Sequence, residues 1–260
     1  MIKNKIYSIL SFLLLFVFSL LFLSYQEYWE YKILGDKYYY LQDYAKAIEY
    51  YQKALQLKPD YPEVYYYLGK IYKIQNIYQI ALFYFNKSLE YKNQFQIKEM
   101  IVLVYDEISE IYFFQKKYSD FLSSLLSLIQ NDKYSEYLNQ SYYRLIPILP
   151  NQKTIYAKAY FRIGYYYFFS GIYDKCINYF LFSKSFQYKE SISYWLLSKA
   201  FFSIGDNSEY RKTESLAYSM DHNLYNFDIK YKWKKIPLSK EYILAIEKFI
   251  NEFSNHFYLQ

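Results

Sequence analysis

Residues 31–59 read YKILGDKYYYLQDYAKAIEYYQKALQLKP, and residues 65–93, which begin 34 positions later, read YYYLGKIYKIQNIYQIALFYFNKSLEYKN. Eight positions correspond at this offset: Tyr31, Leu34, Gly35, Tyr38, Ala47, Tyr51, Ala54 and Pro59 pair with Tyr65, Leu68, Gly69, Tyr72, Ala81, Phe85, Ser88 and Asn93. A fixed period of this length predicts a stack of helical hairpins, because each hairpin leaves an apolar face that only a neighbour can cover.

The spacing inside the first stretch predicts two helices that pack closely. Its large residues recur three or four positions apart, so they share one face of a helix. Gly35 lies beside that face, where a missing side chain lets the next helix approach, and Tyr51 fills space between two alanines on the second helix. Asp43 is a favourable helix start. Pro59 ends the second helix, because the residue before a proline disfavours the α region.

These positions resemble the signature of the tetratricopeptide repeat (TPR), a helix–turn–helix unit of about 34 residues. Tyr31 stands where that family prefers tryptophan and Asn93 where it prefers proline. Residues 28–95 would hold repeats one and two, and less regular copies follow in residues 102–135 and 157–220. The matching positions of the third copy are Tyr105, Ile108, Ser109, Tyr112, Tyr118, Leu125 and Leu128. Those of the fourth are Tyr160, Ile163, Gly164, Tyr167, Gly171, Tyr173, Cys176, Phe180 and Ser183, and those of the fifth are Tyr194, Leu197, Ser198, Phe201, Gly205 and Ala217. The resemblance implies an all-α solenoid of about five TPR-like hairpins.

The later copies depart from the pattern in places. The third carries about six inserted residues and has Phe121 where a small residue is expected, and the fifth has Tyr210 and Glu214 where small and aromatic residues are expected. Residues 136–156 do not fit the repeat frame. Prolines end a short helix in this segment, and Asn151 can cap the next helix. We expect this insertion to separate a front block of three repeats from a rear block of two, either as a hinge or as a packed extra helix.

Residues 221–260 are predicted to form a connector and a capping helix. Residues 221–238 look irregular, whereas residues 239–253 place their apolar side chains on one helix face. Helical arrays need an atypical last element that covers the terminal apolar face. Four lysines cluster within residues 230–235. A solvated connector explains them, and an acidic partner or anionic lipid is the alternative.

The N-terminal segment is predicted to anchor the chain in a membrane. Residues 1–5 form a lysine-bearing tail, residues 6–24 are almost wholly apolar, and no charge appears between them and Glu27. Eighteen helical residues span about 27 Å, close to the hydrocarbon thickness of a bilayer, about 30 Å. A cleaved signal peptide is the alternative, but Phe22 stands where cleavage after Ser24 would need a small residue.

Charges on either side of this span predict its orientation. Lys3 and Lys5 precede it, and acidic residues predominate just after it. Positive charge tends to stay on the cytoplasmic side. We therefore expect a single-pass protein of the inner (cytoplasmic) membrane, with its N-terminus in the cytoplasm and the repeats on the periplasmic or outer side.

Composition and motifs argue against catalysis and nucleic-acid binding. The net charge is +6 over 260 residues, and lysines alternate with acidic residues on the predicted helices, so no basic stripe suggests nucleic acid. The single cysteine, Cys176, falls at a small-residue core position, and the two histidines lack metal-ligand spacing. Phosphate-loop, dinucleotide and metalloprotease motifs are absent from the sequence. We therefore expect no enzyme activity, no cofactor, no metal and no small-molecule substrate.

The resemblance implies a protein-binding groove lined by the first helix of each hairpin. Carried onto this chain, the groove positions of the family are Lys32, Asp36, Tyr40, Tyr66, Tyr67, Lys70, Asp106, Glu107, Glu110, Phe114, Phe161, Arg162, Tyr165, Phe169, Trp195 and Lys199. Tyr, Trp and Arg commonly anchor interfaces. Packing between helices is the alternative role for the aromatic ones. Chaperone-binding members clamp a C-terminal carboxylate with Lys and Asn; here Lys32 matches, but Asp36 and Tyr67 stand where the asparagines would be.

We therefore expect a membrane-tethered TPR adaptor or scaffold that binds a peptide or helix of a partner protein in its concave groove, within a bacterial cell-envelope assembly. Two alternatives stay open. One is a structural subunit of a large envelope machine, such as a flagellar-motor collar or a secretion complex. The other is a regulatory subunit of a cell-wall enzyme.

Overall fold

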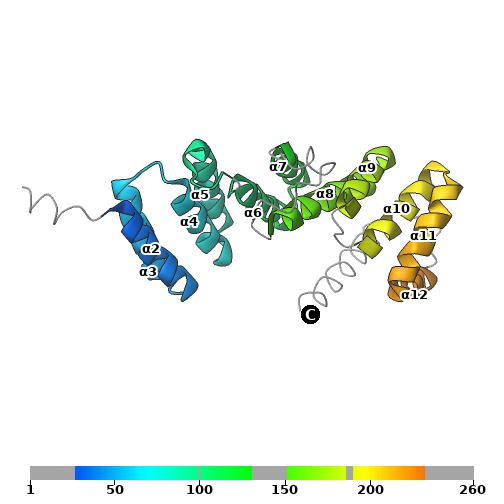
Figure 1. The fold of residues 1–260 in the computed structure, drawn as a ribbon, viewed down its shortest axis with the longest axis horizontal. Coiled ribbons are helices and arrows are strands. Elements are labelled where there is room, and N and C mark those ends of the chain that lie inside the picture. The colour runs from blue at the N-terminus through cyan, green and yellow to red at the C-terminus, as the bar shows by residue number, and fades with distance from the viewer. Residues whose placement is uncertain (1–26, 99, 131–150, 186–189, 232–260) are drawn as a thin grey trace, which may run out of the picture. The chain divides into compact units, whose positions relative to one another are not determined.

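The computed structural model describes residues 27–98, 100–130, 151–185 and 190–231, and the regular elements in these ranges are all helices (Figure 1). Within these ranges the helices pair as five hairpins: α2 (Tyr28–Tyr40) with α3 (Tyr44–Leu57), α4 (Pro62–Ile74) with α5 (Tyr78–Glu90), α6 (Met100–Phe114) with α7 (Tyr118–Gln130), α8 (Asn151–Phe169) with α9 (Tyr173–Ser185), and α10 (Glu190–Ile204) with α11 (Asn207–Met220). A 3-10 turn, η1 (Lys92–Gln94), follows α5, and α12 (His222–Tyr231) follows α11. The all-α prediction is confirmed for these residues.

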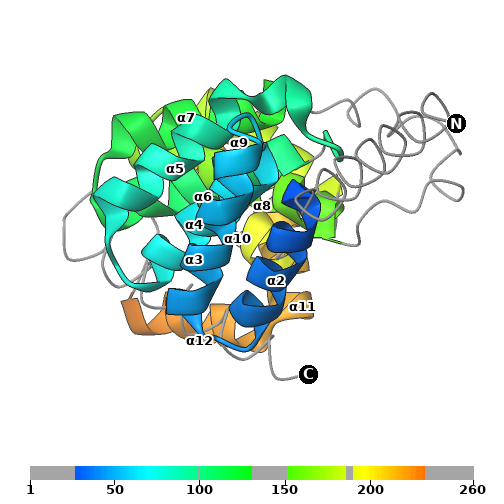
Figure 2. The ribbon, with the colours of Figure 1, turned by 90° about the vertical axis from the view of Figure 1, so that its left-hand side faces the viewer.

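The chain divides into two compact units, unit 1 (residues 1–100) and unit 2 (residues 101–260). In unit 1, Figure 2 shows α2 and α3 packed side by side. In unit 2, α8 packs on α7 and α9, and α10 packs on α9 and α11. The predicted division into three front repeats and two rear ones is wrong, because Leu125 and Leu128 of α7 share a core with Ile155 and Tyr160 of α8.

All five hairpins turn through the same backbone geometry. One residue of each turn has a positive φ, at the same position of the repeat: Gln42, Asn76, Lys116, Gly171 and Gly205. The N–H of the next residue donates to a carbonyl near the end of the first helix, at 2.8–3.0 Å; the acceptors are Tyr38, Tyr72, Tyr112, Tyr167 and Phe201. This bond closes the end of the first helix. Asp43 then caps α3 as predicted, because its side chain accepts from the Lys46 N–H at 3.2 Å.

A glycine on the first helix lets an aromatic ring of the second helix lie against its backbone. A Cβ atom added to the glycine would lie within 3 Å of the ring in three pairs: Gly35–Tyr51 (2.5 Å), Gly69–Phe85 (2.6 Å) and Gly164–Phe180 (2.8 Å). Carbon atoms in contact are normally about 3.5–4.0 Å apart, so no side chain fits there. The predicted close approach at Gly35 is confirmed. The third hairpin has Ser109 and Leu125 at the corresponding positions.

Three tyrosines form a stack in each of three hairpins. Two come from the first helix and enclose one from the second: Tyr31 and Tyr38 around Tyr50, Tyr65 and Tyr72 around Tyr84, and Tyr160 and Tyr167 around Tyr179. Ring centroids are 5.4–6.4 Å apart, with interplanar angles of 2–30°. Each ring pair contributes about 0.5–1.5 kcal/mol beyond its burial. The tyrosines therefore have a repeated structural role.

Two predicted boundaries change. α8 begins at Asn151, so residues 151–156 belong to this helix and not to an insertion. Residues 222–231 are helical and not irregular. The reason is that Leu224 is fully buried in the core that contains Trp195, and that burial stabilises another helical turn.

Among the residues described above, no helix combines the length and apolar character needed to cross a bilayer. The span predicted at residues 6–24 lies outside them, as do the rest of the insertion and the capping helix at 239–253. The side chains of the lysine cluster at 230–235 also lie outside the description.

Candidate functional site

In unit 1 the predicted groove residues lie on α2 and α4 and contact one another. Lys32 Nζ lies 2.6 Å from Asp36 Oδ2. The Tyr51 hydroxyl of α3 donates to Asp36 Oδ1 at 2.8 Å. Lys32 Nζ also lies 5.5 Å from the centre of the Tyr67 ring. Both carboxylate oxygens of Asp36 are thus engaged inside the chain, and Lys32 is held between a carboxylate and an aromatic ring.

Tyr67 is held on several sides, whereas Tyr40 is open to solvent. The Tyr67 ring stacks on Tyr51 with centroids 5.9 Å apart and meets Tyr39 edge-on at 5.3 Å. Burial raises the pKa of Tyr67, with the neighbouring Tyr40 adding to the shift, and burial also raises the pKa of Tyr51. Both hydroxyls therefore stay protonated at neutral pH. Tyr40 is 73% exposed.

Lys70 of α4 contacts rings in place of a carboxylate. Its Nζ lies 5.7 Å from the ring centre of Tyr39 and 5.6 Å from that of Tyr66. Within the part of the chain that the structure describes, no carboxylate pairs with Lys70. Tyr66 itself is 5% exposed and so belongs to the core. We call the set formed by Lys32, Asp36, Tyr40, Tyr67 and Lys70 the α2–α4 cluster.

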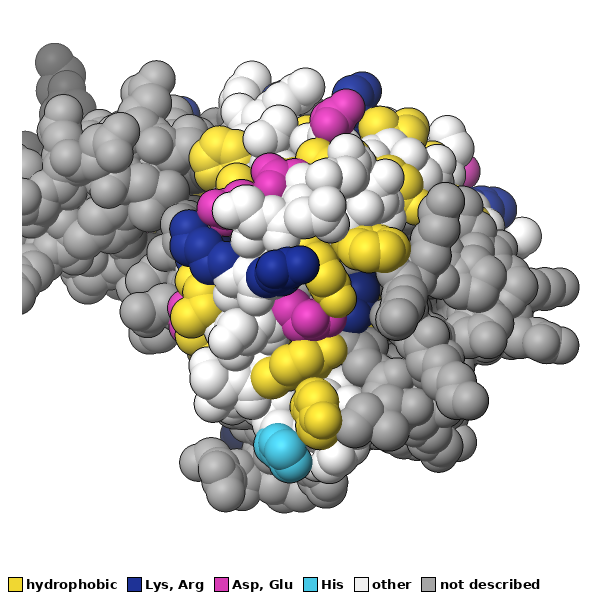
Figure 3. Space-filling model, turned by 90° about the vertical axis from the view of Figure 1, so that its right-hand side faces the viewer, with side chains coloured by type: hydrophobic (Ala, Val, Ile, Leu, Met, Phe, Trp, Pro, Cys, Tyr) yellow, Lys and Arg dark blue, Asp and Glu magenta, His cyan; other side chains and the backbone are white. Residues whose placement is uncertain are grey.

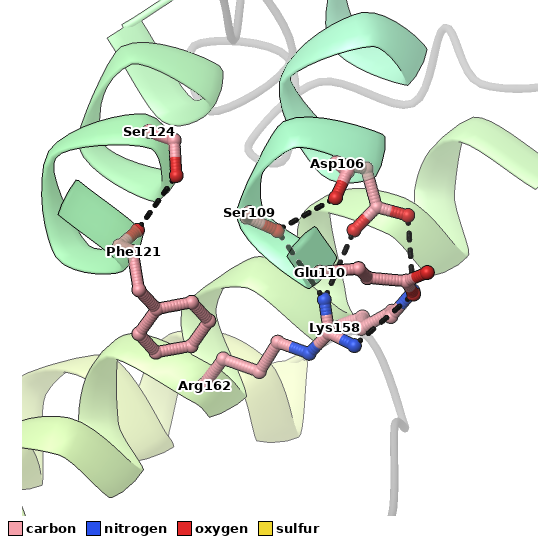
Figure 4. A network of polar contacts seen from close by, with 7 residues as sticks. All are labelled: Asp106, Ser109, Glu110, Phe121, Ser124, Lys158 and Arg162. Atoms are coloured by element: carbon pink, nitrogen blue, oxygen red, sulfur yellow. Dashed lines mark hydrogen bonds and ion pairs between the residues drawn. The ribbon is translucent and has the colours of Figure 1, made fainter. Parts of the chain in front are cut away.

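In unit 2 four charged side chains join α6 to α8 in one network (Figure 4). Lys158 Nζ lies 2.9 Å from Asp106 Oδ2 and 2.6 Å from Glu110 Oε1. Arg162 places Nη1 3.2 Å from Asp106 Oδ1 and Nη2 3.2 Å from Glu110 Oε1. The four side chains are only 14–25% exposed. Two acids and two bases compensate one another, so Glu110 and Arg162 join two hairpins to each other.

Lys158 was missed in the sequence prediction. A signal for it exists, because Asp106 and Glu110 are four residues apart on one helix and Lys158 and Arg162 are four apart on another. Such stripes of opposite charge match when the two helices lie side by side. Of the other predicted residues on α6, Glu107 is half-buried and Phe114 is 61% exposed.

The remaining predicted residues lie on α8 and α10, and most pack inside unit 2. Phe161, Trp195 and Lys199 are 5%, 0% and 3% exposed. These three side chains present almost no accessible surface to a partner, because α8 and α10 pack in a core that α11 and α12 also join. The half-buried rings of Tyr165 and Phe169 contact each other with centroids 4.4 Å apart.

The fifth hairpin replaces an aromatic residue with a carboxylate that collects three donors. Glu214 Oε1 accepts from Lys199 Nζ at 3.2 Å, from the Tyr210 hydroxyl at 2.9 Å and from the Tyr218 hydroxyl at 3.1 Å. A buried ammonium needs such a counter-charge. This cluster explains why the fifth repeat departs from the sequence pattern at Tyr210 and Glu214.

The described side chains offer little for metal or nucleophilic chemistry. Within the described ranges no three His, Cys, Asp or Glu residues gather closely enough to hold a metal ion. Cys176 is fully buried, and burial raises the pKa of its thiol to about 12. The reactive thiolate is therefore scarce at neutral pH.

At the end of unit 2 formed by α10–α12, hydrophobic and charged side chains are interspersed over the visible surface (Figure 3). The exposed apolar side chains there include Ile204, Met220 and Tyr225. Scattered apolar side chains are ordinary on protein surfaces. We assign no site to this end.

Comparison with known proteins supports the repeat interpretation. A family model described as TPR repeat matches residues 35–76. The fold is similar to the solved structure of the MamA protein, with 20% sequence identity, a TM-score of 0.52, and 81% of this chain and 98% of that chain covered. It is also similar to YrrB, described as a TPR protein with an unusual peptide-binding site, with 14% identity, a TM-score of 0.55, and 77% of this chain and 90% of that chain covered. No curated protein matches the sequence. The comparisons therefore support a TPR-like fold.

Proposed function

We propose that this chain is a membrane-tethered scaffold whose α2–α4 cluster binds a peptide or helix of a partner protein in a bacterial cell-envelope assembly. The observation that carries the proposal is the cluster itself. It brings a largely exposed Tyr40, the ordered ring of Tyr67 and the half-buried Lys70 together on consecutive first helices. The peptide-binding site named for YrrB, which has the same fold, supports this kind of role.

The cluster has the properties of an anchor site. Tyrosine rings supply large contact areas at a low entropy cost, and they are common at the centres of interfaces. Tyr67 is already ordered by Tyr51 and Tyr39, so a partner does not have to immobilise it. Tyr40 adds an exposed ring and a hydroxyl beside it.

The membrane part of the proposal rests on the apolar residues 6–24. Such an anchor would hold the α2–α4 cluster close to the bilayer, because α2 begins at Tyr28. It would place the repeats on the periplasmic or outer side of the inner membrane. Tethering raises the effective concentration of a site for partners in the same membrane.

Site-specific photo-cross-linking in the full chain, expressed in membranes, tests the proposal. A photo-reactive residue replaces Tyr40 in one variant and Tyr225, an exposed tyrosine of α12, in a matched control. We expect a discrete cross-linked partner from position 40 and none of the same mass from position 225. The Tyr67→Ala change should abolish the position-40 product. Identical products from both positions would refute this assignment of the binding face.

A structural subunit of a large envelope machine is the second candidate. It is favoured by exposed apolar side chains on second helices: Ile80 and Phe83 of α5 are 40% and 55% exposed, and Leu181 and Phe182 of α9 are 43% and 46% exposed. Such residues suit side-by-side packing of subunits. A stoichiometric complex of ring size, purified from membranes and lost in Phe83→Ser, would favour this candidate over the peptide-binding scaffold.

A further inference from the structure

The cations at the predicted groove positions, together with Lys158, differ in what neutralises them. Lys32 pairs with Asp36, Lys158 and Arg162 pair with the acids of α6, and Lys199 pairs with Glu214, in every case with an N–O distance of 3.2 Å or less. Among the cations at predicted groove positions, Lys70 is the exception, because its contacts are the rings of Tyr39 and Tyr66. A positive charge is thus left without a carboxylate inside the α2–α4 cluster.

The two rings fix where that charge sits. Tyr66 is one turn before Lys70 on α4, and Tyr39 comes from α2. Tyr66 is 5% exposed and both rings contact Tyr67, at centroid distances of 5.3 and 5.4 Å, so neither can move freely. Contact with ring faces attracts an ammonium but does not satisfy its three N–H donors. Lys70 therefore presents a positioned cation with hydrogen-bonding capacity to spare.

The charge balance of the cluster indicates the occupant. Lys32 and Asp36 cancel each other, and Asp36 is also bonded to Tyr51, so the cluster keeps a net charge of one positive unit from Lys70. A single carboxylate from a partner would make the cluster neutral. Lys32 is already engaged, so the paired donors that a chain-terminal carboxylate needs are not offered here. A side-chain carboxylate held by one ammonium fits this arrangement better.

We propose that Lys70 binds the carboxylate of an aspartate or glutamate inside a partner segment, with a neighbouring apolar side chain of that segment packed on Tyr67 and Tyr40. This inference rests on the proposed function and narrows it to an acidic internal peptide segment. Removing one charge from a hydrogen bond between two charged groups lowers the binding affinity about 10-fold to 100-fold.

A display library of random twelve-residue segments, each fused at both ends so that no free carboxylate is present, is the probe. It is selected on the full chain reconstituted in lipid nanodiscs. We expect the recovered segments to share one acidic position beside an aromatic or large apolar residue. A synthetic segment chosen from them should bind Lys70→Gln about 10-fold or more weakly. Lys175→Gln is the matched control, because Lys175 also lies over a tyrosine ring, with its Nζ 5.2 Å from the centre of the Tyr167 ring. This control variant should bind the segment as tightly as the unmodified chain does.

Charge exchange separates binding chemistry from folding. The Lys70→Glu chain should reject the acidic segment and accept the same segment with lysine at the acidic position. Recovered segments without an acidic preference, a free C-terminal carboxylate preferred over an internal one, or equal binding by Lys70→Gln would each overturn this inference and leave the scaffold proposal standing. If Tyr67→Ala and Tyr40→Ala also bind every segment normally, both proposals fail.

Discussion

Replacing Gly69 with alanine tests the contact that sets the distance between α4 and α5. The added Cβ would lie 2.6 Å from two carbons of the Phe85 ring and 3.0 Å from a third. Phe85 is 0% exposed, so its ring has no room to retreat. Overpacking of this kind costs about 1–3 kcal/mol, and three clashing atoms place it near the upper end. Alanine regains about 1 kcal/mol of helix propensity. The net expectation is a loss of about 2 kcal/mol.

Hydrogen exchange of the full chain measures this loss where it occurs. A loss of about 2 kcal/mol lowers the protection of α4 and α5 amides by about 30-fold. Amides of α10 and α11 should be unaffected. Asn86→Ala on the exposed side of α5 is the control, because it changes helix propensity without touching the ring.

A second substitution shows whether the ring is the cause. With Phe85→Leu in place the clash is gone, so Gly69→Ala should stabilise by about 1 kcal/mol through its helix propensity, and the double-mutant cycle should give a coupling of about 3 kcal/mol. The third hairpin already combines a residue with a Cβ, Ser109, with Leu125 at these positions. Unchanged or higher protection in Gly69→Ala alone would refute the reasoning.

Three further predictions concern unit 2 and the buried tyrosines. Glu214→Leu removes the counter-charge of Lys199, whose side chain is 3% exposed, so urea denaturation should show a free energy of unfolding lower by about 3 kcal/mol. The double variant Lys199→Met/Glu214→Leu should recover much of that loss. An unchanged free energy of unfolding in Glu214→Leu would contradict the assigned pair. Asp106→Asn should lower the free energy of unfolding by about 1 kcal/mol, and by less in 1 M salt, because salt screens the ion pairs that this change removes. The control Asp120→Asn on α7 should leave the free energy of unfolding unchanged. Equal losses in the two variants would mean that the α6–α8 network does not contribute to stability. Burial raises the pKa of Tyr61 from 10.0 to about 12 and also raises the pKa of Tyr51, so the folded chain holds these protons more tightly than the unfolded chain. The free energy of unfolding should therefore be at its full value below pH 10 and fall as the pH rises toward 12. A urea midpoint at pH 11 equal to the midpoint at pH 8 would exclude the effect.

The repeat frame predicted more than its eight signature positions. It correctly indicated the close approach at Gly35 and the cap at Asp43. Two further features recur at fixed positions of the repeat but were not predicted: the residue with positive φ in all five turns, and the tyrosine of the second helix that completes each tyrosine stack. These features recur with the period because each hairpin solves the same local packing problem with residues close in the chain.

The candidate binding residues could not be sorted by the frame. Positions equivalent in the repeat fare differently: Asp36 pairs with Lys32, Lys70 lies between rings, and Lys199 is buried against Glu214. Which of these remains available depends on side chains from other helices. The same holds for Trp195, which the frame places on a first helix and the packing of α11 and α12 encloses.

By itself, the sequence determined that the chain contains a series of helical hairpins, that Asp43 starts a helix and that Gly35 lets the next helix approach, because these depend on residues less than about forty positions apart. The tertiary structure alone decided that the third hairpin joins unit 2, that Lys158 and Arg162 neutralise Asp106 and Glu110, and that Lys70 has no acidic partner among the described residues. The physical reason is that packing and charge compensation depend on distances through space between helices far apart in the chain, which no periodic pattern encodes.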